Sequence, residues 1–528
     1  MRGRRGAGAL MAERAQTDAD LAALDRSLLH VFVFLAGTGS MATEICAARL
    51  LAPYFGDSTM VWANIIGLIL GSLSLGYWLG GRIADRRPNP RLLGAIVLAA
   101  ALFVAVVPFV AHPLLERGAS GIGQLAVGTV VGSFFAALVL FAPPVVALGM
   151  VAPFAIRLSL ERPGAAGGVA GTVFALSTAG SLLGTFVPAL VSIPLIGTQR
   201  TLLATSLLLA ATGALVLGRR GLVPVVCIGA LLALPPGAIK PGSGVLYEGE
   251  SAYQFIRVVQ NGNERVLELN EGVVAHSVYD PASVLTGGYW DLFLALPPLL
   301  DRPVQRVAIL GNAGGTVARA YRGLYPAARI DGVEIDAKVS AVGERYFGLR
   351  PGPLLHIYNE DARPFLLRHK QLYDIICVDA YRQPYVPFYL TTREFFQLVR
   401  SRLRPGGIVA LNVAALPRDH ELVDKTAGTL ASVFPQVLSW QALRFNALVI
   451  GFERPLAPGT LARAAGVAPA RLRPLLRLLE RQAKAVAPAD DPWTDDRAPV
   501  EWVVDRMIVK AAREGVSLSE ERTLPTTP

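Results

Sequence analysis

The stretch Val307–Asp336, VAILGNAGGTVARAYRGLYPAARIDGVEID, decides the fold of the C-terminal half of this chain. A short apolar run leads into a glycine-rich turn, a helical segment and a second apolar run, so the order strand, turn, helix, strand is predicted. The turn contains Gly311, Gly314 and Gly315, and we expect it to expose the N–H groups that begin the helix to a ligand. Glu334 lies 23 residues after Gly311, where a carboxylate can accept both hydroxyls of a ribose.

The turn departs from the dinucleotide-binding fingerprint. Ala313 and Thr316 occupy the second and third glycine positions of the pattern G-x-G-x-x-G. A pyrophosphate ligand is therefore disfavoured. A small nucleoside such as S-adenosylmethionine or its decarboxylated form fits better.

Apolar and helical runs alternate around this stretch. Strand-like runs are predicted at 307–310, 330–333, 355–358, 375–378 and 408–413, with helical runs at 317–324, 339–346 and 392–403. The alternation predicts a doubly wound parallel sheet of the class I methyltransferase-like type, with ligands at the carboxyl ends of the strands. A hairpin (253–259 and 265–269, turning at 261–263) should precede it, and a strand pair (437–452) should follow.

The N-terminal half is much more apolar than a soluble domain. The chain has 528 residues, 52% of them hydrophobic, and a mean hydropathy of +0.45. Seven stretches approach the roughly 20 residues that cross a bilayer as a helix: 28–50, 60–81, 92–111, 125–149, 169–195, 201–218 and 221–239. The last stretch is the weakest because it is short and contains Pro224, Pro235 and Pro236.

Arginines collect at the borders of these stretches, in alternate loops. The positive-inside rule places those loops and the arginine-bearing N-terminus in the cytoplasm, and this placement explains the net charge of +10 without nucleic acid. Since a nucleoside ligand such as S-adenosylmethionine is a cytosolic metabolite, we expect segment 221–239 to be re-entrant. Six crossings would then leave the C-terminal domain in the cytoplasm, beneath the cell (inner) membrane.

These patterns divide the chain into six parts. We expect a polar tail (1–27), a transmembrane domain of six to seven spans (28–239), a linker (240–252), a β-hairpin subdomain (253–300), a nucleoside-binding domain (301–455) and a helical extension (456–528). The extension should contain an amphipathic final helix (500–512) preceded by capping residues Asp495 and Asp496. Three cysteines and six histidines without metal-ligand spacing predict no metal site.

Four carboxylates follow the predicted strands, where the sheet would bind a nucleoside. They are Glu334 and Asp336 after the second strand, Asp361 after the third and Asp379 after the fourth. Their placement at successive strand ends favours a joint role over isolated loop positions. We expect Glu334 to bind ribose, Asp361 the adenine amino group, and Asp379 to face the reacting centre.

Residues 253–452, and more weakly 490–512, resemble the spermidine/spermine synthase (polyamine aminopropyltransferase) family. The motifs that carry the resemblance are Tyr253-Gln254, LELNEG (267–272), Tyr289 in GGYWD, LGNAGG (310–315), VEID (333–336), EDA (360–362) and VDAYRQPYVPFYLTTREFF (378–396). The fusion to many apolar spans resembles the membrane-bound bacterial branch of that family, in which a major-facilitator-like region precedes the synthase.

The resemblance implies a donor, a base and an acceptor. The donor would be decarboxylated S-adenosylmethionine, a co-substrate rather than a permanently bound cofactor, in contact with Gln254, Tyr289, Glu334 and Asp361. Gly311, Gly314 and Ala362 would lie beside it, and Asp379 would be the catalytic base. The acceptor would be a small amine. A homodimer is one option for the assembly.

Three departures from the family affect the acceptor. Gly314 stands where the family has an Asp that binds the donor amine, Arg382 where a second Asp grips the diamine, and Trp290 where His or Gln is usual. Two carboxylates are lost and a cation is gained, so putrescine is expected to be a poor acceptor. Asp291, Glu268 and Glu271 on the hairpin side are the groups that would compensate.

Two other functions fit parts of the sequence. A methyltransferase that uses intact S-adenosylmethionine would need the same nucleoside pocket. A transporter or sensor is suggested by GGRIADRR (80–87), which resembles the cytoplasmic-loop motif of major facilitators, and by Glu44 and Arg49 in or beside the first span.

Overall fold

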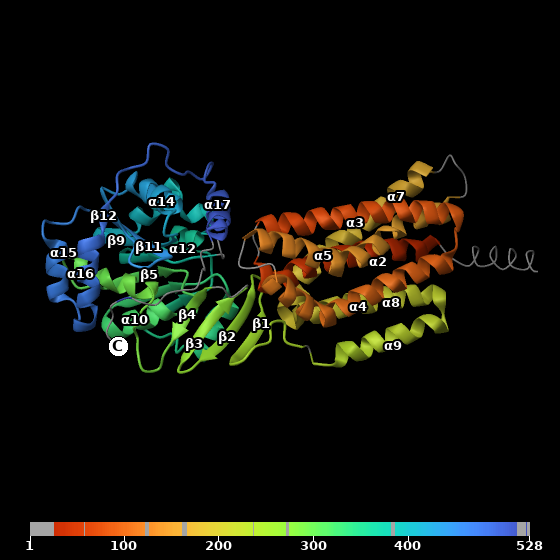
Figure 1. Ribbon diagram of the computed structural model, residues 1–528, viewed down its shortest axis with the longest axis horizontal. Coiled ribbons are helices and arrows are strands. Elements are labelled where there is room, and N and C mark those ends of the chain that lie inside the picture. Colours follow the sequence, from red (N-terminus) through yellow and green to blue (C-terminus); the bar gives the residue numbers. More distant parts are fainter. Residues whose placement is uncertain are drawn as a thin grey trace, which may run out of the picture. The chain divides into compact units, whose positions relative to one another are not determined.

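The computed structural model describes residues 26–56, 59–121, 126–160, 166–235, 237–270, 274–381, 386–514 and 524. Most of the tail 1–27 therefore lies outside the described residues, as do Glu271 and Arg382. The chain forms two compact units, a helical one that extends to Pro241 and includes Glu250–Phe255, and an α/β one that contains Ile256 onward (Figure 1).

The first unit is a bundle of long apolar helices. They are α2 (Arg26–Phe55), α3 (Thr59–Arg86), α4 (Pro90–Gly121), α5 (Ala126–Gly149), α6 (Val151–Ser159), α7 (Ala166–Val187), α8 (Ile193–Leu217) and α9 (Arg219–Ala233). A π-helical turn, η2 (Pro188–Ser192), joins α7 to α8. Five helical segments of the described chain are long and apolar enough to cross a membrane, with α5 and α6 counted as one and α7 and α8 counted as one.

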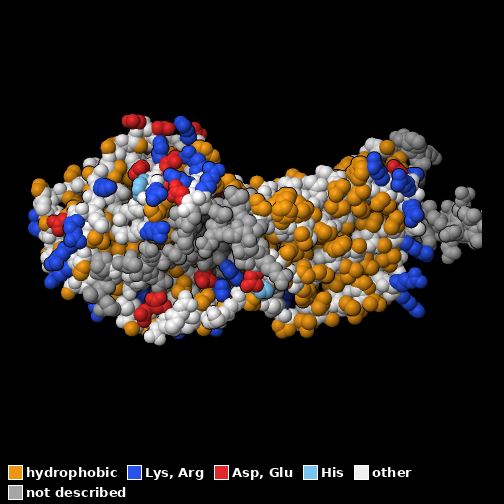
Figure 2. Space-filling model, viewed as in Figure 1, with side chains coloured by type: hydrophobic (Ala, Val, Ile, Leu, Met, Phe, Trp, Pro, Cys, Tyr) orange, Lys and Arg blue, Asp and Glu red, His pale blue; other side chains and the backbone are white. Residues whose placement is uncertain are grey.

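The outer surface of the bundle is apolar. Large hydrophobic side chains such as Leu70, Phe135 and Val226 are more than half exposed, and hydrophobic atoms cover the visible face of the bundle in Figure 2. An exposed apolar surface of this extent marks contact with another molecule or a membrane.

The predicted boundary between the fifth and sixth spans is a sharp turn. Gly197 has a φ of +83°, which breaks the continuous helical assignment from α7 to α8. A positive φ is readily adopted by glycine and costly for other residues. The chain therefore reverses direction there, and 169–195 and 201–218 remain separate passes.

The two ends of the bundle differ in charge. Arg86 ends α3, Arg91 lies at the start of α4 and Arg219 begins α9, and at the same end Arg157 of α6 pairs with Asp85 at 3.5 Å. Figure 2 shows Lys and Arg side chains gathered at this end of the helices. We call it the arginine end.

The residues after α9 are held at the opposite end of the bundle. Tyr54, near the C-terminus of α2, donates its hydroxyl to the carbonyl of Ile239 at 2.5 Å. Glu250 accepts the N–H of Thr198, just after the α7–α8 turn, at 2.6 Å. The described chain thus runs seven times between the two ends of the bundle, and the re-entrant arrangement expected for 221–239 in a membrane stays a prediction.

Helix α9 is short for a membrane span. Pro224 lies inside it, and Pro235 follows its end at Ala233. The 15 residues of α9 rise about 22 Å along the bundle, less than a bilayer core of about 30 Å.

The predicted hairpin forms part of a four-stranded sheet with the order β1-β2-β3-β4. Its strands are β1 (Val245–Glu250), β2 (Phe255–Asn261), β3 (Glu264–Leu269) and β4 (Ala275–Tyr279). β2 and β3 pair antiparallel around Gly262, whose φ is +61°, so the predicted turn is confirmed. β1 begins inside the segment that we expected to be a linker.

The core of the second unit is an eight-stranded sheet with the order β12-β10-β11-β9-β8-β5-β6-β7. Its strands are β5 (Arg306–Leu310), β6 (Arg329–Val333), β7 (Leu355–Tyr358), β8 (Tyr373–Val378), β9 (Leu403–Ala414), β10 (Gln436–Trp440), β11 (Asn446–Phe452) and β12 (Lys484–Ala485). The five strands from β9 to β7 are parallel, whereas β11 pairs antiparallel with β9 and β10. The methyltransferase-like α/β fold and the predicted strand pair are confirmed.

Helices and short 3-10 turns cover both faces of this sheet (Figure 1). The helices are α10 (Thr316–Leu324), α11 (Ala337–Tyr346), α12 (Ala362–Arg368), α13 (Arg393–Ser401), α14 (Glu421–Ala431), α15 (Thr460–Val467), α16 (Arg473–Gln482) and α17 (Val500–Arg513). The 3-10 turns are η3 (Tyr289–Ala295), η4 (Pro297–Leu299), η5 (Phe388–Leu390) and η6 (Ala470–Leu472).

Alternate strand residues contribute to two hydrophobic cores. Val307 and Ile309 of β5 pack with α10 and α16 on one face, and Ala308 and Leu310 pack with α12, α13, α14 and α17 on the other. Strands buried on both faces read as continuous apolar runs, which is why the sequence predicted them well.

The final helix is attached through a contact that the sequence did not predict. Asp495 accepts hydrogen bonds from the guanidinium of Arg363, at 2.7 and 2.5 Å, and from the Thr392 hydroxyl at 2.7 Å. Hydrogen bonding to Arg363 lowers the pKa of Asp495. The expected capping role is therefore wrong for Asp495, which ties the segment before α17 to α12 and α13.

Candidate active site

The glycine-rich turn between β5 and α10 is stabilised from within the protein. The N–H groups of Gly311 and Asn312 both donate to the carbonyl of Val333 at 2.9 Å, and Gly315 donates to Asn312 at 2.8 Å. Gly311 and Gly315 have φ values of +89° and +90°, as expected for glycines in a tight turn. The N–H groups of Gly311, Asn312 and Gly315 are thus paired within the protein, and exposure of the N–H groups that begin α10 to a ligand stays a prediction.

The space around Gly314 is filled by neighbouring groups, so there is no room for the Asp side chain that the family has at this position. Its N–H donates to the hydroxyl of Ser277 at 2.8 Å. A Cβ at this position would lie 3.0 Å from Cβ of Ser277 and 3.2 Å from the ring of Phe347. Ser277 of β4 therefore occupies the space that the family's Asp would need.

Glu334 is buried directly after β6 and orders the turn. One carboxylate oxygen accepts the N–H of Ala313 at 2.8 Å, and the other accepts the N–H of Asp336 at 3.1 Å. Its side chain is only 8% exposed, and burial raises its pKa to about 7 despite these hydrogen bonds. Ala313 adopts a positive φ of +43° to make its contact, an uncommon conformation for a residue with a Cβ.

Asp336 and Asp361 cap helices. Asp336 accepts the N–H of Lys338 at the start of α11, and Asp361 accepts the N–H of Arg363 at the start of α12, both at 3.0 Å. The second oxygen of Asp361 accepts the Tyr389 hydroxyl at 2.6 Å. Ala362 is the first residue of α12 and is 7% exposed. Local capping therefore accounts for both carboxylates, and a nucleobase contact by Asp361 remains a prediction.

Asp379 follows β8 and is oriented by a chain of amides. Asn412 of β9 donates its side-chain N–H to a carboxylate oxygen of Asp379 at 3.0 Å, and Asn446 of β11 donates to the Asn412 side-chain oxygen at 3.0 Å. The Tyr381 hydroxyl donates to the Asn412 carbonyl at 3.0 Å. Burial raises the pKa of Tyr381 above its usual value, so this hydroxyl remains protonated.

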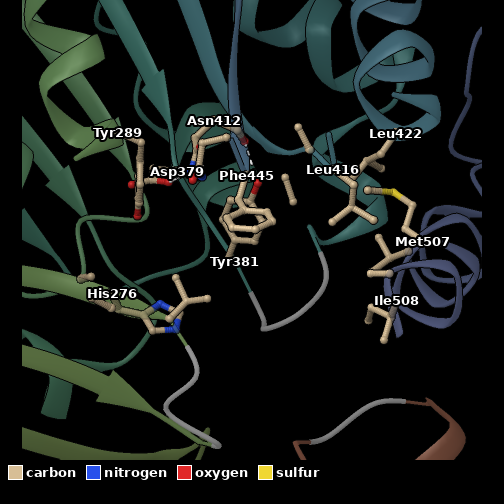
Figure 3. A pocket seen from close by; sticks show the side chains of 18 residues that line it. His276, Tyr289, Asp379, Tyr381, Asn412, Leu416, Leu422, Phe445, Met507 and Ile508 are labelled. Atoms are coloured by element: carbon tan, nitrogen blue, oxygen red, sulfur yellow. Dashed lines mark hydrogen bonds between the residues drawn. The ribbon is translucent and has the colours of Figure 1, made fainter. Parts of the chain in front are cut away.

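Asp379 lines a cavity with a volume of about 180 Å³ at the carboxyl ends of the strands. Figure 3 shows Asp379 near Tyr289 at one side of this cavity, and Leu422, Met507 and Ile508 at the other. Tyr289 stacks on Trp290 with ring centroids 4.3 Å apart. Ala313 also lines the cavity, so the glycine-rich turn and Asp379 meet there.

The remaining predicted residues lie outside this cavity. Gln254 precedes β2, where its carbonyl accepts the N–H of Ser251 at 2.9 Å. Asp291 is fully buried and accepts hydrogen bonds from the loop that precedes it, and Glu268 pairs with Arg257 at 3.2 Å. The two hairpin-side carboxylates that the structure describes are therefore occupied elsewhere. Within the described ranges, no group of three His, Cys, Asp or Glu side chains could hold a metal ion.

Sequence reasoning missed the amides and the helical wall of the cavity. Asn412 is a lone polar residue in the apolar run IVALNVA of β9, and this was a detectable signal. The cavity-facing residues of α17 gave no signal beyond amphipathicity, because their contact with the site depends on how distant segments pack.

Comparison with known proteins identifies relatives of the second unit. The spermine/spermidine synthase domain family matches residues 289–443. A probable polyamine aminopropyl transferase of Bifidobacterium longum is 33% identical over 215 residues, 39% of this chain and 48% of that protein. The polyamine aminopropyltransferase of Vibrio vulnificus is 32% identical over 229 residues, 41% of this chain and 75% of that protein.

The chain thus spans about half the length of the first relative and three quarters of the second. Among solved structures, a probable spermidine synthase from Corynebacterium glutamicum is 19% identical, with a TM-score of 0.38 over 52% of this chain and 95% of that chain.

Proposed function

Because the chain belongs to the polyamine aminopropyltransferase family, we propose that it transfers an aminopropyl group from decarboxylated S-adenosylmethionine to an amine acceptor. The observation that carries the proposal is the position of Asp379. This carboxylate lies within the family-matched segment, at the carboxyl end of β8, and faces the cavity with Asn412 holding one oxygen.

The donor would occupy the sheet edge between the glycine-rich turn and Asp379. Glu334 would accept the ribose hydroxyls, since a carboxylate oxygen has two lone pairs and can accept a hydroxyl beside a backbone N–H. Tyr289 would lie against the donor from the cavity side. Gly311, Gly314, Asp361, Ala362 and Gln254 complete the proposed donor site on the basis of the family motifs.

In the proposed reaction the acceptor amine loses one proton, one C–N bond forms and one C–S bond breaks. Alkylammonium groups have a pKa near 10, so at neutral pH the acceptor must lose a proton before it can attack. Asp379 takes that proton, and the amine nitrogen then bonds to the methylene carbon beside the sulfonium. The C–S bond breaks, its electron pair neutralises the sulfur, and methylthioadenosine leaves.

The experiment is a product assay on the full chain in detergent. With decarboxylated S-adenosylmethionine and a mixture of amines, the wild type should release methylthioadenosine. Asp379→Asn should lower kcat by about 10²–10⁴-fold with little change in donor affinity, because a base acts in the transition state. Asp301→Asn, at an exposed carboxylate outside the cavity, is the matched control. Near-normal turnover by Asp379→Asn would rule out this mechanism.

The same assay separates the methyltransferase alternative. Release of S-adenosylhomocysteine from intact S-adenosylmethionine, with no methylthioadenosine from the decarboxylated donor, would establish methyl transfer instead.

The helical unit supports a second part of the proposal, a multi-pass anchor in the cell (inner) membrane. Its outer side chains are apolar, and five segments have the length and composition of membrane spans. Sedimentation with membranes that resists carbonate washing and yields to detergent would test the anchor.

A further inference from the structure

We propose that the acceptor is a monoamine with an apolar aliphatic or aromatic tail, bound with its amine at Asp379 and its tail against α17. This inference rests on the proposed aminopropyl transfer and specifies the substrate class of the same site. A polycation would be the poorer substrate.

The wall of the cavity opposite Asp379 is one face of α17. Val504, Met507, Ile508 and Ala511 line the cavity, and their spacing of three, four and seven residues places them on the same side of a helix. Leu416 and Leu422 extend this aliphatic wall. An amine tail that reaches it would exchange water for hydrocarbon contact.

Two aromatic rings lie between the base and this wall. Figure 3 shows Tyr381 and Phe445 in the middle of the cavity, between Asp379 on one side and Met507 on the other. Apolar surface therefore continues from the proposed position of the reacting nitrogen to α17. A tail that extends from that nitrogen remains in apolar surroundings along its length.

The charge of the cavity disfavours a diamine. Among the 18 described side chains that line it, Asp379 is the single carboxylate. The distal ammonium of a diamine would lie among aliphatic groups without an opposite charge, and burial of an unpaired charge is strongly unfavourable. Glu268 and Asp291 do not line the cavity and already have partners.

The most direct test compares putrescine with n-pentylamine, in which a methyl group replaces the second ammonium. The full chain in detergent is given decarboxylated S-adenosylmethionine and one amine at a time, and methylthioadenosine release is measured. We expect kcat/KM for n-pentylamine to exceed that for putrescine at least tenfold. From propylamine upward, kcat/KM should rise about fourfold per methylene until the tail fills the cavity. Putrescine equal to or better than n-pentylamine would overturn the inference.

A variant at the wall tests the location of the tail. Met507→Asp places a carboxylate opposite Asp379 and should lower kcat/KM for n-pentylamine while raising it for putrescine. Met507→Ala, which only removes apolar contact, should reduce the gain per methylene. Trp502→Ala is the control on the same helix, since Trp502 is 60% exposed and does not line the cavity. An unchanged preference in both Met507 variants would contradict binding of the tail at α17.

The outcomes separate the inference from the function on which it rests. If the wild type releases methylthioadenosine with putrescine as the preferred acceptor, aminopropyl transfer stands and the apolar acceptor is wrong. If no amine of either kind supports release, the proposed function itself fails. Should Met507→Asp not fold, as judged by its thermal midpoint, the wild-type series and Met507→Ala still decide the question.

Discussion

Glu334 combines a structural and a proposed binding role in one buried carboxylate. It holds the glycine-rich turn through the N–H of Ala313, and burial keeps its pKa near 7. Hydroxyl groups of a bound ribose would donate to the ionised form and favour it. Binding of an adenosyl ligand should therefore be coupled to release of the Glu334 proton.

This coupling predicts a pH dependence of ligand affinity. Above pH 7 Glu334 is ionised in the free protein and the affinity should be constant. Below pH 7 a proton must leave before the ligand binds, so the dissociation constant should rise up to about tenfold per pH unit. Calorimetry with methylthioadenosine between pH 5.5 and 8.5 measures it. Glu334→Gln should bind at least tenfold more weakly at pH 8 and lose the pH dependence, whereas equal wild-type affinity at pH 6 and pH 8 would contradict the assignment.

The residues of the site were predictable from sequence to different degrees. The carboxylates at the ends of parallel strands follow from the topology, because those ends meet at one edge of the sheet. Their partners did not follow. The pairing of Asn412 with Asp379 and of Ser277 with Gly314 depends on register between segments distant in sequence, which no local pattern encodes.

At the level of elements, the backbone of the β5–α10 turn packs closely against the backbone that follows β8. A Cβ on Gly311 would lie 2.4 Å from the backbone oxygen of Asp379, closer than any real contact. The φ of +89° at Gly311 would add strain for any other residue. The absence of a side chain at Gly311 thus allows the backbone of Asp379 to lie against the turn.

Gly311→Ala should therefore destabilise the protein and displace Asp379. We expect a loss of about 1–3 kcal/mol of unfolding free energy from backbone strain, with more from the collision, together with a large drop in methylthioadenosine release. Gly262→Ala is the control, because its φ is also positive, at +61°, while its Cβ would meet nothing within 4 Å. That variant should lose about 1 kcal/mol and keep its activity. Equal activity of both variants in a denaturation and turnover comparison would show that the contact with Asp379 is unimportant.

Steric crowding also affects the substitution of Gly314 by Asp. From charge alone, Gly314→Asp together with Arg382→Asp should improve putrescine use. The crowding of Gly314 by Ser277 and Phe347 means that Gly314→Asp must first displace packed groups. Overpacking of this kind usually destabilises by about 1–3 kcal/mol, so the charge cannot be restored without repacking.

For the whole molecule, the number of helical passes and the arginines at one end of the bundle predict which side of the membrane each end faces. If the bundle spans the membrane as we propose, the positive-inside rule predicts that the arginine end lies in the cytoplasm. Ile239 and Glu250 are bonded to Tyr54 and Thr198 at the other end, seven passes later. The chain should therefore leave the bundle on the extracytoplasmic face. A donor made in the cytosol requires the opposite arrangement, with the C-terminal unit in the cytoplasm. Hydropathy alone does not show whether 221–239 crosses the membrane, so the sequence is compatible with both arrangements.

A reporter fused after Gly244 distinguishes the two arrangements. We expect alkaline phosphatase at this position to be active, since it folds only outside the cytoplasm, and a fusion after Arg87 at the arginine end to be inactive. Long domains can override the charge of short loops during insertion, so the two fusions must be read together. Activity after Arg87 and none after Gly244 would invert the bundle and place the C-terminal unit beside the cytosolic donor. The expected result would instead require that the nucleoside donor reach the catalytic unit on the outer face, so that donor supply, rather than the chemistry at Asp379, would limit turnover in the cell.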